Sequence, residues 1–287
     1  MTDVMLAGRY QLLDTLGEGS NAVVWRALDS ASGNLVAIKR LRPEIARVEE
    51  WRARLRREGR AIVTLRHPGV VRVSELGEED GGAPYLVMEL FYGETLATRL
   101  ARVARLGVEE ALAIAVPLLD ALAAVHAHGL VHRDVKPSNV MLVKELRSDR
   151  VVLLDFGLAC LLDGSQRVTR EGARIGTPVY MSPEQARGVP LIDARADVWA
   201  VGGLLYEMLA GRAPFRASGA LEVLHSVIAK QPAPLRAVVP DVPAALDEAI
   251  TVALSKRPQD RHGSAIAMAV ALRAIGGAQR GRAARHP

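Results

Sequence analysis

The sequence predicts an α+β protein of two lobes, in which a small antiparallel β-sheet with one helix precedes a larger, mainly helical lobe. Two observations lead to this prediction. Short apolar runs separated by glycine-containing turns fill the first part of the chain, as is typical of strands. From Glu94 onward the composition shifts to alanine- and leucine-rich patterns of helical period. We therefore expect a β-rich lobe at residues 1–90, a helical lobe at 91–275 and a basic, disordered tail at 276–287.

The composition is that of a folded protein, and it excludes several classes of function. Of the 287 residues, 49 % are hydrophobic and 24 % are charged, which is ordinary for a globular chain. The single cysteine, Cys160, excludes an internal disulfide framework and a cysteine-rich zinc site. Most of the positive charge behind the net +5 is arginine, spread along the chain without interleaved aromatic residues. Nucleic acid is therefore not an expected partner.

No segment of the sequence predicts a membrane span or a secretory leader. The longest apolar runs, 111–125 and 198–210, are interrupted by Pro117 and Asp120 in the first and by Glu207 in the second. Neither reaches the roughly 20 clean apolar residues that a bilayer requires. The N-terminus has no sustained apolar core. We expect a cytoplasmic chain, either alone or as the cytoplasmic domain of a longer, membrane-anchored protein.

The first two strands are expected at residues 10–16 and from Ala22 onward, with a glycine turn between them. Gly17 and Gly19 allow close backbone approach, and exposed N–H groups in such a turn can bind phosphate oxygens. The third glycine of a GxGxxG pattern is replaced here by Ala22. Taken alone, this stretch favours the other interpretation, a plain hairpin turn.

The strand expected at residues 35–39 ends on a lysine. Alternation places Val36 and Ile38 on one face, and Lys39 with Ala37 on the other. Lys39 is the only lysine in the first 135 residues. A compact ammonium can approach a phosphate where the wider guanidinium does not fit. The alternative is a lysine at a strand end that reaches solvent.

An arginine-rich helix is expected over residues 43–65, with Glu58 in the middle of its apolar face. A buried carboxylate needs a cationic partner, and Lys39 is the natural candidate. The alternative places Glu58 at the edge of this face, paired with a neighbouring arginine. The apolar residues on the face are Trp51, Leu55, Ile62 and Leu65.

The stretch from Val131 to Gly157 places acidic and amide side chains beside apolar strands. Asp134 and Asp155 stand on either side of Asn139 in the sequence, and short strands are expected at 139–143 and 151–154. An uncompensated charge would be costly there, and catalytic groups commonly lie on loops at the ends of rigid elements. The stretch therefore indicates a metal ion and an anionic substrate.

The rest of the larger lobe is expected to be helical, apart from a polar loop over residues 163–175. The helix at 109–128 contains Pro117 as a kink and is followed by Gly129, a good C-cap. Asp197 lies among apolar residues, and we expect it to cap a helix start or a loop rather than to act in catalysis. Other strands are expected at 70–76 and 85–90, and other helices at 195–209, 220–229, 244–254 and 264–275.

Six motifs, in order and at consistent spacing, resemble the signatures of eukaryotic-type protein kinases, most closely those of bacterial serine/threonine kinases. Together they cover about residues 10–275. The motifs are Gly17-x-Gly19, Val36-Ala37-Ile38-Lys39, Glu58, His132-Arg133-Asp134 with Asn139, Asp155-Phe156-Gly157, and Ser182-Pro183-Glu184.

The resemblance implies a two-lobed kinase fold and transfer of the ATP γ-phosphate to protein serine and threonine hydroxyls. Asp134 would accept the hydroxyl proton, and Lys136 would reach the transferring phosphate. Asn139 and Asp155 would bind Mg²⁺, with Mn²⁺ as the alternative metal. Lys39, held by Glu58, would bind the α- and β-phosphates. The other nucleotide-binding residues implied are Gly17, Glu18, Gly19, Val24, Ala37, Met88, Glu89 and Phe91.

The resemblance also implies regulation by phosphorylation of the activation loop. Arg133 resembles the arginine that receives an activation-loop phosphate, and Thr169 is the expected acceptor. Related kinases often carry a second threonine where this chain has Glu171. Thr177 resembles the threonine that contacts Asp134 and lines the substrate site. A second copy of the chain is the expected partner for autophosphorylation in trans.

Two other readings remain open from the sequence. A pseudokinase would use the same fold only for binding, but such proteins usually lose the strand lysine, the catalytic aspartate or the metal aspartate, and all three are present. A small-molecule kinase of related fold is disfavoured by Thr177 and the Ser182-Pro183-Glu184 segment, which resemble a platform for a peptide substrate. Arg261 is expected to pair with Glu184.

Overall fold

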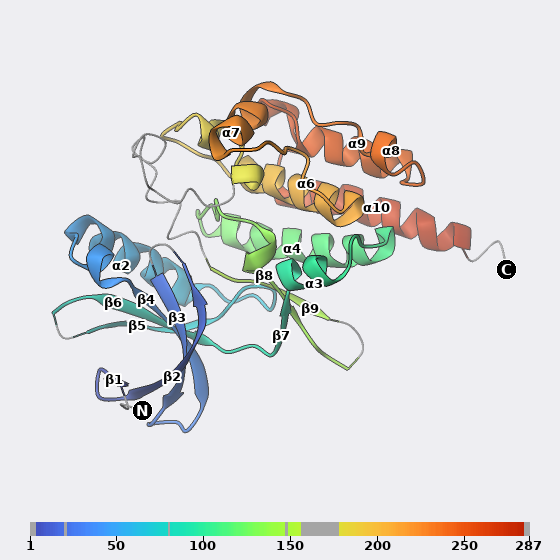
Figure 1. Ribbon diagram of the computed structural model, residues 1–287. Helices are drawn as coiled ribbons and strands as arrows, with labels where there is room; N and C mark the ends of the chain where they lie inside the picture. The colour runs from blue at the N-terminus through green and yellow to red at the C-terminus, as the bar shows by residue number, and fades with distance from the viewer. Residues whose placement is uncertain (1–3, 20–21, 80, 147–148, 156–177, 284–287) are drawn as a thin grey trace. The chain divides into compact units, whose positions relative to one another are not determined.

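The computed structural model describes residues 4–19, 22–79, 81–146, 149–155 and 178–283 (Figure 1). The chain divides after Tyr92 into two compact units, Met1–Tyr92 and Gly93–Pro287. Each unit has its own sheet and its own buried core, and each is described by itself below.

The N-terminal unit is built on a six-stranded antiparallel sheet. Its strand order is β1-β2-β3-β4-β6-β5. The strands expected from the sequence are present, and several run a few residues longer. The three-residue strand β1 was not expected, because it is too short to show an alternating pattern. The bounds are β1 Val4–Leu6, β2 Tyr10–Glu18, β3 Ala22–Asp29, β4 Leu35–Leu41, β5 Val73–Glu78 and β6 Pro84–Glu89.

One face of this sheet carries a hydrophobic cluster. Ile38 is fully buried in it and Val36 packs against it, which confirms the predicted alternation of β4. Tyr10 and Tyr85 meet edge to face within it, with ring centroids 6.1 Å apart. The buried members are Leu6, Tyr10, Leu12, Ala27, Ile38, Tyr85 and Val87.

Helix α2 (Glu49–Thr64) packs on the opposite face of the sheet. A Cβ on Gly59 would come within 3.0 Å of Leu76 and Leu86, so the helix lies close to β5 and β6. The single helix expected over residues 43–65 is in fact two, since α1 (Pro43–Ala46) ends before Val48, which is extended. The apolar period continued across this break, and so the sequence pattern did not reveal it.

The C-terminal unit contains a small antiparallel sheet of order β7-β8-β9. Strands β8 (Val140–Val143) and β9 (Arg150–Leu153) were expected from the sequence. Strand β7 (Gly93–Thr95) was not expected, because three residues of mixed polarity carry little strand signal. A side chain at Gly93 would run into the carbonyl of Leu142, so glycine permits this pairing.

Helix α6 (Arg195–Ala210) forms the centre of the helical part of this unit (Figure 1). Nearly all of its residues are buried, and it packs against α4 (Val108–Ala127) and α9 (Ala244–Ala253). The approach to α9 is close, since a Cβ on Gly202 would lie 2.8 Å from Ala253. The other elements are α3 Leu96–Arg102, α5 Pro183–Ala186, α7 Ala220–Ala229, α8 Leu235–Val238, and the 3₁₀ turns η1 Pro137–Asn139, η3 Pro178–Tyr180 and η4 Pro258–Asp260.

The last helix, α10 (Ala265–Ala283), is longer than the sequence predicted. We expected the helix to end at Ile275 and the rest to be disordered, whereas the helix continues to Ala283. Each of the two central glycines costs about 1 kcal/mol relative to alanine, but alanine, glutamine and arginine around them favour helix. Arg273 also pairs with Asp120 of α4 at 2.5 Å. Among the described residues, no helix is long and apolar enough to cross a membrane.

Candidate active site

The loop at residues 132–139, which we call the catalytic loop, brings three of the predicted site residues into direct contact. The Lys136 Nζ lies 2.8 Å from Asp134 Oδ2, and the Asn139 Nδ2 lies 3.1 Å from the same oxygen. The Asn139 Nδ2 also donates to the Asp134 carbonyl at 2.8 Å. Two donors therefore hold one carboxylate oxygen in place. The other, Oδ1, accepts no hydrogen bond from the described residues.

Asp155 lies at the same end of the small sheet as Asn139. Val140 of β8 pairs with Leu153 of β9, and the Leu154 N–H donates to the Asn139 carbonyl at 2.8 Å. Asp155 follows directly and has a positive φ of 41°, which is uncommon for a residue with a side chain. The β8–β9 pairing thus places the backbone of Asp155 close to that of Asn139.

These two side chains fit a magnesium ion. The Asn139 amide nitrogen is used by Asp134, which leaves its Oδ1 as the oxygen available to a cation. Among the described residues there is no group of three or more histidine, cysteine or acidic side chains that could hold a metal. Mg²⁺ commonly takes only one or two protein oxygens and completes its shell with phosphate and water. A site of one carboxylate and one amide is therefore adequate.

Asp197 fixes the backbone of the catalytic loop. Its side chain is fully buried at the start of α6, and it accepts from the His132 N–H at 2.8 Å and from the Arg133 N–H at 2.7 Å. The Nε2 of His126 lies 2.8 Å from the same carboxylate. The expectation that Asp197 caps a loop is therefore confirmed. These bonds hold Arg133 at a positive φ of 65°, a conformation that otherwise costs a side-chain-bearing residue about 1–3 kcal/mol.

Gln185 holds the other side of Arg133, and the sequence analysis missed it. Its Nε2 donates to the Arg133 carbonyl at 2.8 Å, while its Oε1 accepts from the Ser182 N–H at 3.0 Å. Ser182 in turn accepts from the Gln185 N–H, which completes a capping box at the start of α5. The pattern Ser-x-x-Gln could have revealed the capping box, but no local signal reveals the bond to Arg133.

The predicted pair of Glu184 and Arg261 is present. Two parallel bonds of 2.7 Å join the guanidinium to the carboxylate, and both side chains are largely buried. Arg261 also donates to the carbonyls of Ser255 and Arg195, so its remaining N–H groups are used. Because Arg195 is the first residue of α6, Arg261 links α5 to the start of α6.

In the N-terminal unit, the predicted nucleotide-binding side chains share one face of the sheet. Val24 pairs with Lys39 across β3 and β4, and Ala37 pairs with Met88 across β4 and β6. Lys39 is only 8 % exposed, so it is not a strand-end lysine that reaches solvent. Glu89 lies next along β6, opposite Val36.

The glycine turn closes the β2–β3 hairpin. Gly17 pairs with Val24, and the Gly19 N–H donates to the Ala22 carbonyl at 2.8 Å. Arg42, at the end of β4, donates to the Gly19 carbonyl at 2.9 Å and reaches Glu18 at 3.0 Å. This contact, which no local sequence pattern indicates, anchors one side of the turn to the residue after β4.

Several predicted site residues lie wholly or partly outside the described part of the chain. Thr169, Glu171 and Thr177 lie outside the described residues, as do Phe156 and Gly157. The backbone of Glu58 belongs to α2, on the same sheet face as Lys39, but its side chain is also outside the described part. The Lys39–Glu58 pair therefore stays a prediction.

Comparison with known proteins gives a consistent family match. A family model described as protein kinase domain matches residues 10–271. A probable serine/threonine-protein kinase of Streptomyces coelicolor is 38 % identical over 273 residues, which cover 94 % of this chain and 40 % of that protein. The serine/threonine-protein kinase PknA of Mycobacterium tuberculosis is 38 % identical over 288 residues, which cover 99 % of this chain and 64 % of that one. The chain thus spans between two fifths and two thirds of the length of these relatives.

Among solved structures, the chain is similar to the kinase domain of PknI from Mycobacterium tuberculosis. The two are 31 % identical with a TM-score of 0.76, and the match covers 96 % of this chain and 99 % of that domain. The match therefore includes nearly every element described above.

Proposed function

The chain belongs to the protein kinase family, and on that premise we propose that it transfers the γ-phosphate of ATP to serine and threonine hydroxyls of proteins. The predicted fold class is confirmed by the family match and by the likeness to the PknI kinase domain. The observation that supports the activity most directly is the hydrogen-bonded group of Asp134, Lys136 and Asn139, with Asp155 at the neighbouring strand end.

Asp134 is the proposed catalytic base. Its Oδ2 is held by two donors, and its Oδ1 is left to accept the proton of a substrate hydroxyl as that hydroxyl attacks phosphorus. The ammonium of Lys136, already bonded to Asp134, would stabilise the negative charge that develops on the transferring phosphoryl group. Phosphoryl transfer depends mainly on such alignment and charge stabilisation.

Asn139 and Asp155 are the proposed ligands of Mg²⁺ or Mn²⁺. When bound, the ion would neutralise phosphate charge and help to orient the phosphates. The hydrogen bonds from the Asn139 amide to the Asp134 carbonyl and carboxylate hold this amide in one orientation.

Residues of the N-terminal unit are the proposed nucleotide ligands. Lys39, oriented by Glu58, would bind the α- and β-phosphates, and the backbone of the Gly17–Gly19 turn would cover the phosphates. Supporting observations are the burial of Lys39 and the shared face that carries Val24, Ala37, Lys39 and Met88. The proposed adenine contacts are Val24, Ala37 and Met88 through side chains, and Glu89 and Phe91 through the backbone.

The first test compares wild type with Asp134→Asn, using labelled ATP, magnesium and a generic protein substrate. Asparagine keeps the size of the side chain and an acceptor for Lys136, but it cannot accept the hydroxyl proton. We expect phosphate transfer to fall by a factor of about 10² to 10⁴, while nucleotide binding and thermal stability stay close to wild type. Unchanged turnover in the variant would remove Asp134 as the base.

Wild type itself decides between an enzyme and a pseudokinase in the same experiment. A chain that binds ATP but transfers no phosphate to itself or to protein would favour the pseudokinase. Lys39→Met is the second variant, and it should lose autophosphorylation. Retained autophosphorylation would mean that another cationic group binds the ATP phosphates. We further propose that the chain acts in the cytoplasm and that one copy phosphorylates another on Thr169. Arg133 would then bind the phosphate on Thr169 through its guanidinium group. Phosphosite mapping by mass spectrometry tests this over residues 163–177.

A further inference from the structure

Two hollows of the C-terminal unit share a half-buried tyrosine–glutamate pair. Both are lined by Tyr180, Glu207 and Gly211, and each has a volume of about 450 Å³. The first, which we call the near hollow, extends to Lys136 of the catalytic loop. The second, the far hollow, extends along the α6–α7 connection to α7. The two hollows share these three residues, and we call them together the groove; its near end reaches Lys136, which is hydrogen-bonded to Asp134.

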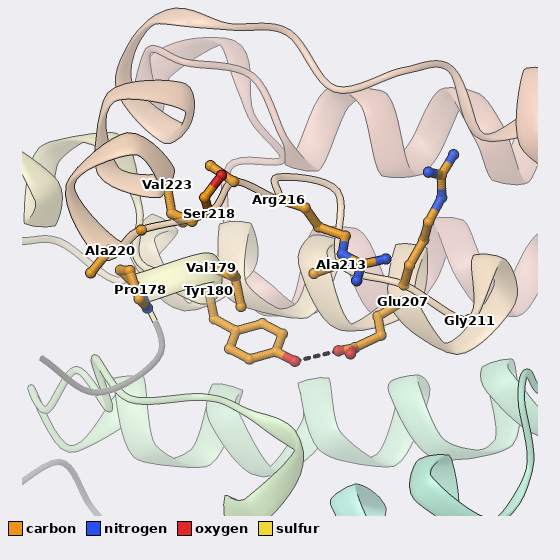
Figure 2. Close-up of a pocket in the computed structure, with 13 residues that line it drawn as sticks. Pro178, Val179, Tyr180, Glu207, Gly211, Ala213, Arg216, Ser218, Ala220 and Val223 are labelled. Carbon is orange, nitrogen blue, oxygen red and sulfur yellow. Dashed lines mark hydrogen bonds between the residues drawn. The ribbon is translucent and has the colours of Figure 1, made fainter.

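Positively charged side chains predominate along this groove. Arg212 and Arg216 line the far hollow and are exposed, and Lys136 lines the near hollow. Glu207 is the one acidic residue among those that line either hollow. Figure 2 shows its carboxylate directed at the Tyr180 hydroxyl, which donates a hydrogen bond to it. Burial raises the pKa of Glu207, whereas the hydrogen bond from Tyr180 and the charge of Arg216 act in the opposite direction.

The far hollow is built on a fixed backbone. Gly211 ends α6 with a φ of 70° and donates to the Glu207 carbonyl at 2.8 Å. A side chain at Gly211 would collide with the carbonyl of Ala104, so glycine permits this close approach just before Arg212. In Figure 2, Arg216 extends from the α6–α7 connection towards Glu207. The remaining walls are mostly apolar, formed by Pro178, Val179, Ala213, Ala217, Ala220 and Val223.

We propose that this groove selects protein substrates that carry an acidic or phosphorylated residue near the phosphoacceptor, with the anionic group bound by Arg212 and Arg216. The inference rests on the proposed function, since a groove leading from Asp134 guides a substrate only if phosphate is transferred there. Guanidinium groups bind carboxylate and phosphate through paired N–H bonds, and two of them in one hollow disfavour a basic side chain.

The test is a peptide library with a central serine or threonine and randomised positions on both sides, phosphorylated with ATP and magnesium. Wild type should prefer aspartate or glutamate at one or more positions by about two- to fivefold, as expected for a partly exposed ion pair. The preference should weaken at higher salt because such pairs are screened. A parallel set with phosphoserine at the selected position asks which anion binds better, and a stronger effect is expected for the doubly charged phosphate.

The decisive variants are Arg212→Ala with Arg216→Ala, and the charge reversal Arg216→Glu. The double variant should lose the acidic preference, and the reversal should favour lysine or arginine at the same position. Arg236→Glu is the matched control, because Arg236 is an exposed arginine of α8 that does not line the groove. It should leave the preference unchanged.

Three outcomes would overturn the inference. One is a wild type with no acidic preference at any position. Another is a preference that survives both Arg212 and Arg216 substitutions, and the third is an equal loss in the Arg236→Glu control. Failure of the proposed function gives a different result, since wild type would then phosphorylate neither the library nor a generic protein.

Discussion

Gln185→Glu isolates one hydrogen bond behind Asp134, the proposed catalytic base. Glutamate keeps the acceptor that bonds the Ser182 N–H, so the capping box retains this half of its bonding. It removes the donor to the Arg133 carbonyl and places a carboxylate against that oxygen instead. Arg133 is also held at its N–H by Asp197, and its φ of 65° is an unfavourable one. The substitution therefore removes one of the hydrogen bonds that hold the residue preceding Asp134.

The magnitude follows from the bonds involved. Loss of a neutral hydrogen bond costs about 0.5–1.5 kcal/mol, and the unsatisfied, partly buried carbonyl facing a carboxylate brings the total to about 1–2 kcal/mol. If this energy holds the catalytic loop in its active shape, kcat should fall by about five- to thirtyfold. The Michaelis constant for ATP should change little, because no proposed nucleotide ligand is touched.

The assay measures kcat and KM for a peptide substrate, together with the free energy of unfolding. Gln185→Ala is the companion variant, since it removes the donor and the acceptor at once. It should match Gln185→Glu in kcat but unfold more easily, because the capping box is also weakened. Wild-type kcat in Gln185→Glu would refute the positioning role and leave Gln185 only as a helix cap.

Two further predictions concern the groove and its floor. Gly211→Ala should destabilise the protein by about 2 kcal/mol or more, because alanine must adopt a φ of 70° and its Cβ would collide with the Ala104 carbonyl. The control Gly129→Ala, at a φ of 71° with no atom near the added Cβ, should lose only about 1 kcal/mol. Equal losses of unfolding free energy in chemical denaturation would contradict the collision. Burial raises the pKa of Glu207 above its ordinary 4.5, so the folded state binds the Glu207 proton more tightly than the unfolded state does. The contribution of Glu207 to stability is therefore largest at low pH and is lost as the carboxyl ionises on raising the pH from about 4.5. Glu207→Gln should therefore gain stability relative to wild type between pH 4.5 and 7, and a difference in unfolding free energy that is constant with pH would contradict this.

Local features of the fold were predictable because they leave local patterns. The alternation of Val36 and Ile38 against Ala37 and Lys39 correctly assigned both faces of β4. Asp197 was recognised as a cap because an acid among apolar residues at a helix start has few other roles. The break before Val48 was missed because the apolar period continued through it.

The contacts that were missed join residues far apart in the sequence. The bond from Gln185 to the Arg133 carbonyl spans 52 residues, and the bond from Arg42 to Gly19 spans 23. In each bond a side-chain N–H donates to a backbone carbonyl oxygen. Because every residue has such a carbonyl, the sequence does not show which one will accept the bond. The contact among Asp134, Lys136 and Asn139 was predictable because the three residues lie within one short loop. The Arg261–Glu184 pair, separated by 77 residues, was expected only through the family resemblance.

The position of Asp197 has a consequence for how the catalytic loop moves. The loop amides of His132 and Arg133 are bonded to a carboxylate whose own helix is almost entirely buried. A surface loop usually opens at little cost, and its amide hydrogens then exchange rapidly with solvent. Here the two amides are released only if the first turn of α6 moves or a buried charge loses its partners. We therefore expect the amide hydrogens of His132 and Arg133, beside the proposed catalytic base, to exchange slowly with solvent although they lie outside regular secondary structure.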